Sequence, residues 1–345
     1  MKNRGFLILA IACLALGLLS ADATAKGREG GSCLLFPFYS TGTGTPGTAN
    51  TELAVLSITN TGPETIQVHT VFVGTSDCTP KNRSFELTPN DTFSFVDYAW
   101  IINKNDVGFF YAYAREWNPN TKKWQEMDYD YLVGQELIFE SWNPANPPAL
   151  YSINAVTFEC IQPNVAGNDL DYLKLDGTEY EIAPNKLIFP RFFGQDNPLT
   201  GPVFFKSSAI LINLSGGQHF TQEAVIAVYN DSEEPFSDTV KFRCWDRIDL
   251  LDISSFTLES NLASSSIADE IYDLDPGDPK KTGWMCIESD YSWIPQTSQY
   301  IQNVNLYGVL LEVVANKYSS ADLPFEQFNP ANNTGSLWWT APWAP

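Results

Sequence analysis

Four short blocks of residues occur twice along the 345-residue chain, in the same order. The matching pairs are Leu34–Tyr39 with 187–192, Ala54–Asn60 with 224–230, Phe85–Phe95 with 248–258, and Asn143–Asn146 with 329–332. Composition alone rarely produces four matches in order, whereas a structural unit that is built twice does so. We therefore predict an internal duplication, which restricts the chain to folds with two similar halves.

The spacing of the blocks predicts where the halves differ. The offset rises from 153 residues in the first block to 170 in the second, so we expect an insertion in the second half. Ser208–Leu214 lies in it and reads as an added strand, because insertions are tolerated best in loops and at sheet edges. We place a first domain at 26–163, a polar linker region at 164–184, and a second domain at 185–345 with the inserted strand and an aromatic C-terminal segment.

Short β-prone runs separated by turn signals predict an all-β protein. Thr51–Asn60 is followed by the turn sequence Thr-Gly-Pro and then by an alternating run over 66–73. The segments 108–114 and 308–314 read as buried strands. Several short strands with few helices are typical of two antiparallel sheets packed face to face. The expected fold is two tandem antiparallel β-sandwich domains, which resemble the immunoglobulin-like modules of exported bacterial proteins.

The first 25 residues have the pattern of a cleaved signal peptide. Lys2 and Arg4 precede an apolar run over 6–19, and Ala23-Thr24-Ala25 offers a cleavage site between small residues. The run is shorter than the roughly 20 residues of a membrane-spanning helix, and no later stretch has that length and apolarity. A lipidated Cys13 and an uncleaved anchor are the alternatives. We expect a secreted protein without a transmembrane segment in its mature form, outside the cell or on its outer surface, with the periplasm as another option.

The cysteines are expected to form structural disulfides. Five of the six remain after cleavage, far apart and without a Cys-x-x-Cys pair, which disfavours a zinc site and fits an oxidising compartment. We pair Cys244 with Cys286, the two cysteines of the second half, and Cys78 with Cys160 in the first. Cys33 is then the candidate for an unpaired thiol.

Acidity restricts the partners of the chain. Its net charge of −21 excludes nucleic acid, because a phosphate backbone would be repelled. Several acidic turns gather the hard oxygen ligands that calcium prefers, and solvated acidic loops are the competing interpretation. The calcium candidates are Asp169, Asp171, Asp176, Asp273, Asp275 and Asp278. No other cofactor is expected.

Catalytic motifs are absent from the sequence. His69 and His219 have no companion at metal-ligand spacing, and neither a nucleophile elbow nor a phosphate-binding loop is found. A glycoside hydrolase that uses two carboxylates stays open, with Glu136, Glu140 and Glu159 as possible members.

Aromatic residues beside turns are candidate ligand contacts. Trp117 and Trp142 each precede an Asn-Pro turn, where a ring can stack on a sugar or anchor a protein partner, or else pin its own loop. The uncharged, tryptophan-rich segment 332–345 is expected to dock as a strand on its own domain or on a second molecule.

These features favour a non-enzymatic structural or adhesive protein of the bacterial cell surface or extracellular matrix, with self-assembly as one mode of action. Its partner is expected to be itself, a cell-surface protein or a glycan. The alternatives are a carbohydrate-binding protein and a carboxylate-dependent glycoside hydrolase.

Overall fold

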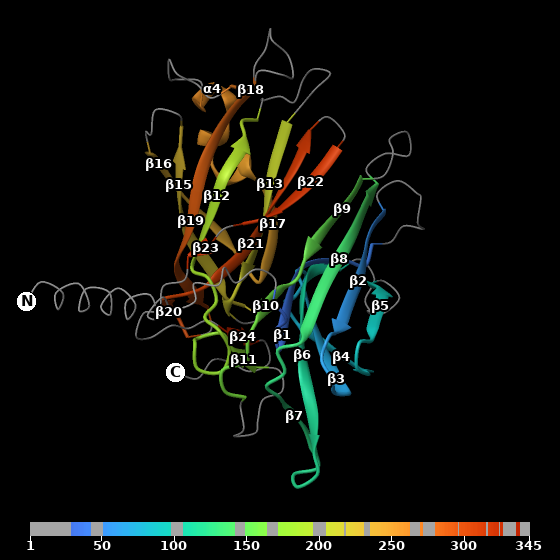
Figure 1. The fold of residues 1–345 in the computed structure, drawn as a ribbon. Helices are drawn as coiled ribbons and strands as arrows, with labels where there is room; N and C mark the ends of the chain where they lie inside the picture. Colours follow the sequence, from blue (N-terminus) through green and yellow to red (C-terminus); the bar gives the residue numbers. More distant parts are fainter. Residues whose placement is uncertain are drawn as a thin grey trace, which may run out of the picture.

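The fold is nearly all β-structure (Figure 1). This computed structural model describes residues 29–42, 51–97, 106–141, 149–163, 172–195, 205–216, 219–230, 235–262, 270–271, 280–295, 297–314, 317–323, 325–326 and 336–338. The predicted signal peptide and the Asn-Pro-Ala-Asn repeat lie outside these residues. Within them, no helix combines the length and apolarity needed to cross a bilayer.

Ten strands build two antiparallel sheets in the first half. They are β1 (Cys33–Ser40), β2 (Thr51–Asn60), β3 (Ile66–Gly74), β4 (Pro80–Leu87), β5 (Thr92–Val96), β6 (Val107–Asn118), β7 (Lys123–Glu126), β8 (Leu132–Ser141), β9 (Ala149–Asn154) and β10 (Val156–Phe158). One sheet has the order β10-β1-β6-β3-β4, with β7 paired to β6, and the other has the order β5-β2-β8-β9. β1 packs against β2 and β8 of the second sheet, and the side chains between them form the first hydrophobic core.

The second half repeats this order strand for strand. Its strands are β12 (Lys186–Phe193), β13 (Phe205–Asn213), β15 (Thr221–Tyr229), β16 (Pro235–Phe242), β17 (Trp245–Asp249), β19 (Lys280–Ile294), β20 (Gln299–Gln302), β21 (Leu306–Val314), β22 (Lys317–Asp322) and β23 (Phe325–Glu326). The sheet β23-β12-β19-β15-β16, with β20 paired to β19, matches the first sheet, and β17-β13-β21-β22 matches the second. The short β18 (Glu270–Ile271) also pairs with β19, and α3 (Leu250–Ile253), η1 (Ser255–Thr257) and α4 (Glu259–Leu262) follow β17.

The match extends to single residues. β1 has a bulge between Phe36 and Tyr39, and β12 has one between Phe189 and Phe192, so a proline within each strand lies in an interrupted stretch of ladder. Asn60 and Asn213 end equivalent strands, and each side-chain oxygen accepts a hydrogen bond from the amide two residues later, at 2.9 Å in both. The predicted repeat is therefore present in the strand order and in the pairing register.

The register corrects the way in which the repeats were aligned from the sequence. The offset of 153 residues continues from β1 into β2, whose counterpart is β13. Ser208–Leu214 is therefore not an insertion, and 224–229 belongs to β15, the counterpart of β3. The alignment was misleading because neighbouring strands of one sandwich have the same alternation of apolar and polar residues.

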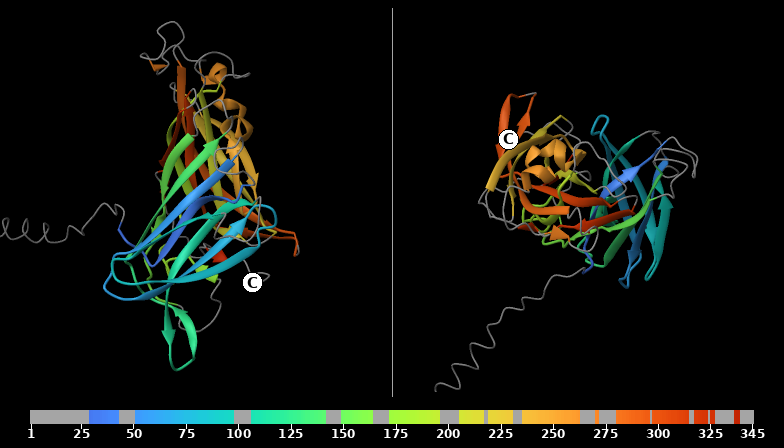
Figure 2. Two further views of the ribbon diagram at one scale, coloured as in Figure 1. Left: turned by 90° about the vertical axis from the view of Figure 1, so that its right-hand side faces the viewer. Right: turned by 90° about the horizontal axis from the view of Figure 1, so that it is seen from above.

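The halves do not form two immunoglobulin-like sandwiches in tandem; their four sheets have a propeller-like arrangement. Seen from above, the halves lie side by side in contact (Figure 2). In the sheet β17-β13-β21-β22, the strand β13 is buried on both faces, because Ala209 and Leu211 lie in the second core while Ile210 and Ile212 join the first. Trp245 also donates from its indole nitrogen to the carbonyl of Pro37 at 2.7 Å.

Residue type explains why the equivalent sheet of the first half, β5-β2-β8-β9, is not buried in this way. On β2 the positions equivalent to Ile210 and Ile212 are Ser57 and Thr59, which form exposed hydroxyl pairs with Ser94 and Thr92 at 2.8 Å. Hydroxyl pairs are satisfied in water, whereas isoleucine side chains gain free energy on burial. The outer face of the second half's sheet therefore packs on the first half, and the equivalent face of the first half stays in solvent.

The predicted linker region contributes to the core. β11 (Tyr172–Lys174) pairs with β24 (Ser336–Trp338), which also pairs with β14 (Ser215–Gly216). Leu173, Leu175, Tyr180 and Ala183 are fully buried in the first core. The C-terminal strand thus docks on its own chain, as the middle strand of a three-stranded sheet.

The disulfide pairing differs from the expectation. Cys78 is bonded to Cys244, which joins the two halves, and Cys33, Cys160 and Cys286 are thiols. Cys78 and Cys244 are thus correct as disulfide members but wrong in their partners, and Cys33 is a thiol as expected. The partners could not be found within each half because docking of the sheet β17-β13-β21-β22 brings Cys244 to the first half, with a Cα–Cα distance of 6.0 Å.

Candidate binding site on the two hairpins

Trp117 lies near the tip of the hairpin that β6 and β7 form. It faces Trp124 across the strands with 5.6 Å between ring centroids, and 49% of its surface is exposed. The turn is built by Asn118, whose side-chain oxygen accepts hydrogen bonds from the amides of Asn120 and Thr121. The hairpin projects from the lower end of the molecule in Figure 1, so the ring pair is presented to solvent and does not pin a loop to the core.

The second half carries an equivalent aromatic pair. Trp293 on β19 faces Tyr300 on β20, with 4.6 Å between ring centroids, and 62% of the Tyr300 surface is exposed. Trp117 and Trp293 hold the same register position in the two repeats, as do Trp124 and Tyr300. Each half therefore places two aromatic rings in contact at an exposed hairpin.

Polar side chains surround the second pair. The Tyr291 hydroxyl, on the same face of the sheet, donates to Glu223 at 2.6 Å, and Lys241 contacts the same carboxylate at 2.7 Å. Hydrogen bonds from Lys241 and Tyr291 lower the pKa of Glu223, so this carboxylate is ionised at neutral pH. Tyr291 also contacts the ring of Tyr300 edge-on at 4.9 Å.

The first pair has amide and charged neighbours. Arg115 donates to the Gln67 side chain at 2.6 Å on the face of the two tryptophans. On the other face of the hairpin, Gln125 donates to Glu116 at 2.7 Å and accepts from Asn118 at 2.6 Å. Rings beside planar amides and carboxylates are the combination that holds an amphipathic ligand, since the ring takes its apolar side and the polar groups take its hydroxyls.

An apolar strip continues from the second pair along the outer face of its sheet. Trp284 stacks on Tyr229 with 4.0 Å between centroids, and Trp284 and Val225 are 39% and 41% exposed. In the first half the positions equivalent to Tyr229 and Trp284 are Val73 and Phe109, which are fully buried. The second half therefore offers the longer aromatic surface.

Of the remaining predicted ligand contacts, the structure describes only Asp176. Trp142, Asp169, Asp171, Asp273, Asp275 and Asp278 lie outside the described residues. Asp176 is half-buried and accepts a hydrogen bond from the Thr178 amide in its own turn. Over the described part of the chain, no three His, Cys, Asp or Glu side chains are grouped as a metal site.

The candidate catalytic carboxylates have different surroundings. Glu140 is fully buried and is held by both terminal nitrogens of Arg247, at 2.6 and 3.3 Å. Glu136 is also fully buried, and Glu159 lines a cavity that is described below. Of the histidines, His69 is buried against Ser84 and Tyr113, and His219 is exposed.

Comparisons with known proteins identify no family. No protein-family model matches the chain, and no curated protein matches it. The solved structure of Thermotoga maritima 1070 is 19% identical over 37% of this chain and 95% of its own, with a TM-score of 0.29.

The pair in the second half was missed in the sequence, although a signal for it exists. In each repeat the two aromatic residues are seven positions apart, Trp117 to Trp124 and Trp293 to Tyr300. A tight hairpin brings residues at such a spacing opposite each other. This shared spacing could have been used to align the two repeats in the sequence, independently of the four matching blocks.

Proposed function

We propose that this chain is an exported, non-enzymatic adhesion protein that binds a surface polysaccharide through the aromatic pairs on its two hairpins. One observation carries the proposal: the same exposed ring pair occurs at the same register position in both repeats. Large aromatic rings left in water lose the free energy of burial, so a duplicated exposed pair is best explained by a ligand that covers it.

A polysaccharide fits the chemistry of the pairs. The carbon–hydrogen face of a sugar ring stacks on an aromatic ring, while its hydroxyls reach charged and amide groups such as Glu223 and Gln67. Two sites on one molecule favour a repeating polymer, because the second contact forms at a high effective concentration once the first has formed.

Export and duplication belong to the same proposal. The signal-peptide pattern of residues 1–25 supports secretion. The disulfide between distant segments supports it too, because disulfides form and persist in oxidising compartments. The two repeats are then copies of one ancestral ten-stranded unit, each of which kept its aromatic pair.

Binding of the secreted protein to a panel of insoluble and soluble polysaccharides tests the proposal. The variants are Trp117→Ala with Trp124→Ala, and Trp293→Ala with Tyr300→Ala. We expect each double variant to weaken binding to a recognised polymer at least a hundredfold, because it loses the second contact, and the quadruple variant to abolish it. Ile161→Ala with Leu150→Ala removes exposed apolar side chains elsewhere and should bind like the unaltered protein.

Equal binding by the quadruple variant and the unaltered protein would refute the role of the pairs. An absence of binding across the panel would refute the choice of a polysaccharide as ligand. Circular dichroism of each variant verifies that the sheets are intact.

A further inference from the structure

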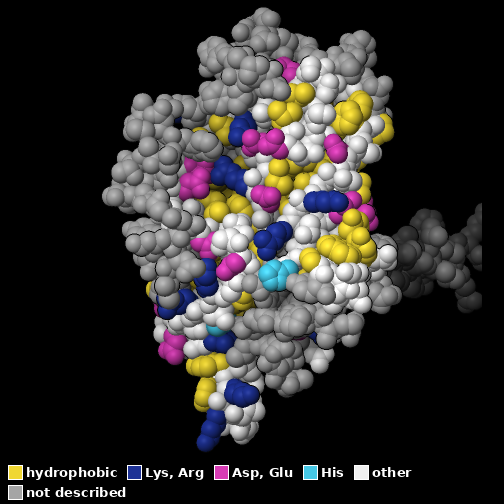
Figure 3. Space-filling model, turned by 180° about the vertical axis from the view of Figure 1, so that it is seen from behind, with side chains coloured by type: hydrophobic (Ala, Val, Ile, Leu, Met, Phe, Trp, Pro, Cys, Tyr) yellow, Lys and Arg dark blue, Asp and Glu magenta, His cyan; other side chains and the backbone are white. Residues whose placement is uncertain are grey.

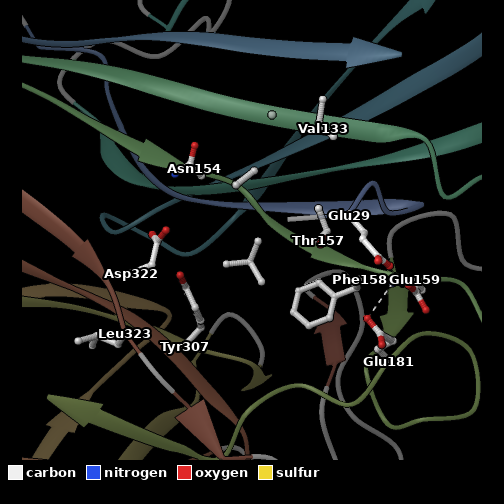
Figure 4. A pocket seen from close by; sticks show the side chains of 13 residues that line it. Glu29, Val133, Asn154, Thr157, Phe158, Glu159, Glu181, Tyr307, Asp322 and Leu323 are labelled. Atoms are coloured by element: carbon white, nitrogen blue, oxygen red, sulfur yellow. Dashed lines mark hydrogen bonds between the residues drawn. The ribbon is translucent and has the colours of Figure 1, made fainter. Parts of the chain in front are cut away.

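A cavity of about 610 Å³ lies where the two halves meet (Figure 4). Its walls come from β8 and the β9–β10 corner of the first half, and from β21 and the end of β22 of the second. β9 and β22 run side by side there, and the Ser320 hydroxyl donates to the Ser152 carbonyl at 2.7 Å. None of the residues that line the cavity belongs to either hairpin, and the inference does not depend on the function proposed above.

Equivalent positions of the two repeats face each other across this cavity. The wall contains Val133 and its counterpart Tyr307, and also Asn154 and its counterpart Asp322. In both pairs the residue of the second half has the more polar or charged side chain: a phenol where the first half has valine, and a carboxylate where it has an amide. Neither repeat could form the cavity alone, so it is a feature of the assembled pair.

The charge of the lining has one sign. Four carboxylates line the cavity, from Glu29, Glu159, Glu181 and Asp322, and its lining residues include no Lys, Arg or His. On the face of the molecule shown in Figure 3, by contrast, acidic and basic side chains are interspersed. A partly enclosed space lined by one sign of charge concentrates the field and favours a ligand of the opposite sign.

The carboxylates lie at two ends of the cavity, with an apolar surface between them. Asp322 and Tyr307 are at one end and Glu159 and Glu181 at the other, while Phe158 lies between the two groups (Figure 4). Glu159 and Glu181 are held together, since the Glu159 amide donates to the Glu181 carboxylate at 3.2 Å and the Glu181 amide donates to the Glu159 carbonyl at 3.1 Å.

Besides the carboxylates, Tyr307 also indicates that the cavity binds a ligand. Its side chain is 1% exposed, and its hydroxyl points into the cavity beside Asp322 (Figure 4). No hydrogen bond between the described residues uses this hydroxyl. Burial, with Asp322 and Glu136 nearby, raises the pKa of Tyr307, so the phenol stays neutral. The wall of the cavity therefore presents a neutral hydroxyl that a ligand or water in the cavity can satisfy.

We propose that this cavity binds an aliphatic diamine or oligoamine. One ammonium group would lie between Asp322 and the Tyr307 oxygen, and another beside Glu159 and Glu181. The methylene chain would lie along Phe158. A single metal ion fits this arrangement poorly, because the carboxylates are separated into two groups by an apolar wall.

Thermal unfolding and isothermal titration with cadaverine and spermidine test this proposal on the full-length secreted protein. We expect either amine to raise the melting temperature, with butylamine at least tenfold weaker because it has one ammonium group. Calcium chloride at the same ionic strength should not reproduce the shift.

Two variants locate the site. Glu159→Gln with Asp322→Asn should weaken amine binding at least tenfold, and Tyr307→Phe, which removes only the hydroxyl, should weaken it severalfold. Glu64→Gln with Glu86→Gln removes the same charge from exposed positions outside the cavity and should bind like the unaltered protein. The proposal is wrong if neither amine shifts the melting temperature at millimolar concentration, or if the cavity and control variants lose binding equally.

Discussion

Two buried carboxyl groups occupy positions where the other repeat has leucine. Glu136 on β8 corresponds to Leu310 on β21, and Asp97, just after β5, corresponds to Leu250. All four are almost fully buried. Asp97 has a clear structural task, because its Oδ2 accepts hydrogen bonds from the amides of Ser40 at 2.8 Å and Ala54 at 2.9 Å. Glu136 has no such task, since no described residue forms a well-aligned hydrogen bond with either of its oxygens.

Replacing Glu136 should therefore stabilise the protein. Burial raises the pKa of Glu136 well above 4.5, with Asp97 nearby adding to the rise and the Phe38 backbone opposing it. Above pH 4.5 the unfolded chain loses this proton while the folded protein retains it, so Glu136 lowers stability as pH rises. We expect Glu136→Leu to raise the free energy of unfolding by about 1–3 kcal/mol at pH 7 and by less at pH 4.

Urea unfolding at the two pH values measures this effect. Asp97→Leu serves as the matched control and should lower stability at both, because it leaves two amides unsatisfied. A loss of stability in Glu136→Leu at pH 7 would show that this carboxyl is stabilised by a contact of its own.

At the scale of elements, the C-terminal strand completes a small sheet. β24 lies between β11 and β14, so its removal leaves the backbone groups of both neighbours without partners. Deletion of residues 335–345 should lower the free energy of unfolding by roughly 2 kcal/mol or more, with no change in oligomeric state. Unfolding in urea and sedimentation velocity measure the two quantities. A stable monomer obtained from an associated parent would instead assign the strand to assembly.

The positions of several strands could be predicted from the sequence, but which strand of one repeat corresponds to which strand of the other could not. Alternation and turn signals placed β2, β3, β6 and β21 correctly, because both depend on local chemistry. The assignment of β15 as the counterpart of β2 failed, since β2 and β3 have similar patterns and only pairing distinguishes them. Trp117 could be selected as a candidate because its Asn-Pro turn is local, whereas its contact with Trp124 needs the hairpin register.

At the scale of the whole molecule, the junction between the halves required tertiary information. Nothing near Cys244 in the sequence indicates Cys78, which is 166 residues away. Arg247 and Glu140 likewise meet only because the second half docks on the first. The alternation at Ile210 and Ile212 signals an apolar outer face, but it does not identify the surface that this face will cover.

The disulfide should make a large contribution to stability. It closes a loop of more than a hundred residues, so restriction of the unfolded chain is worth about 5 kcal/mol. Cys78→Ser with Cys244→Ser should therefore lower the melting temperature strongly, as should a reducing agent with the unaltered protein. Non-reduced peptide mapping verifies the pairing. A peptide that joins Cys244 to Cys286 would contradict the proposed junction.

The most direct test of the central claim compares a long polymer with a short oligosaccharide of the same recognised glycan. If both aromatic pairs bind one ligand, the unaltered protein should bind the polymer at least a hundredfold more tightly than the oligosaccharide. Either single-pair variant, in which one aromatic pair is replaced by alanine and the other is kept, should lose this gain in affinity. Isothermal titration of the three proteins gives the affinities. An unchanged gain in both single-pair variants, or retained binding after loss of all four rings, would contradict the account.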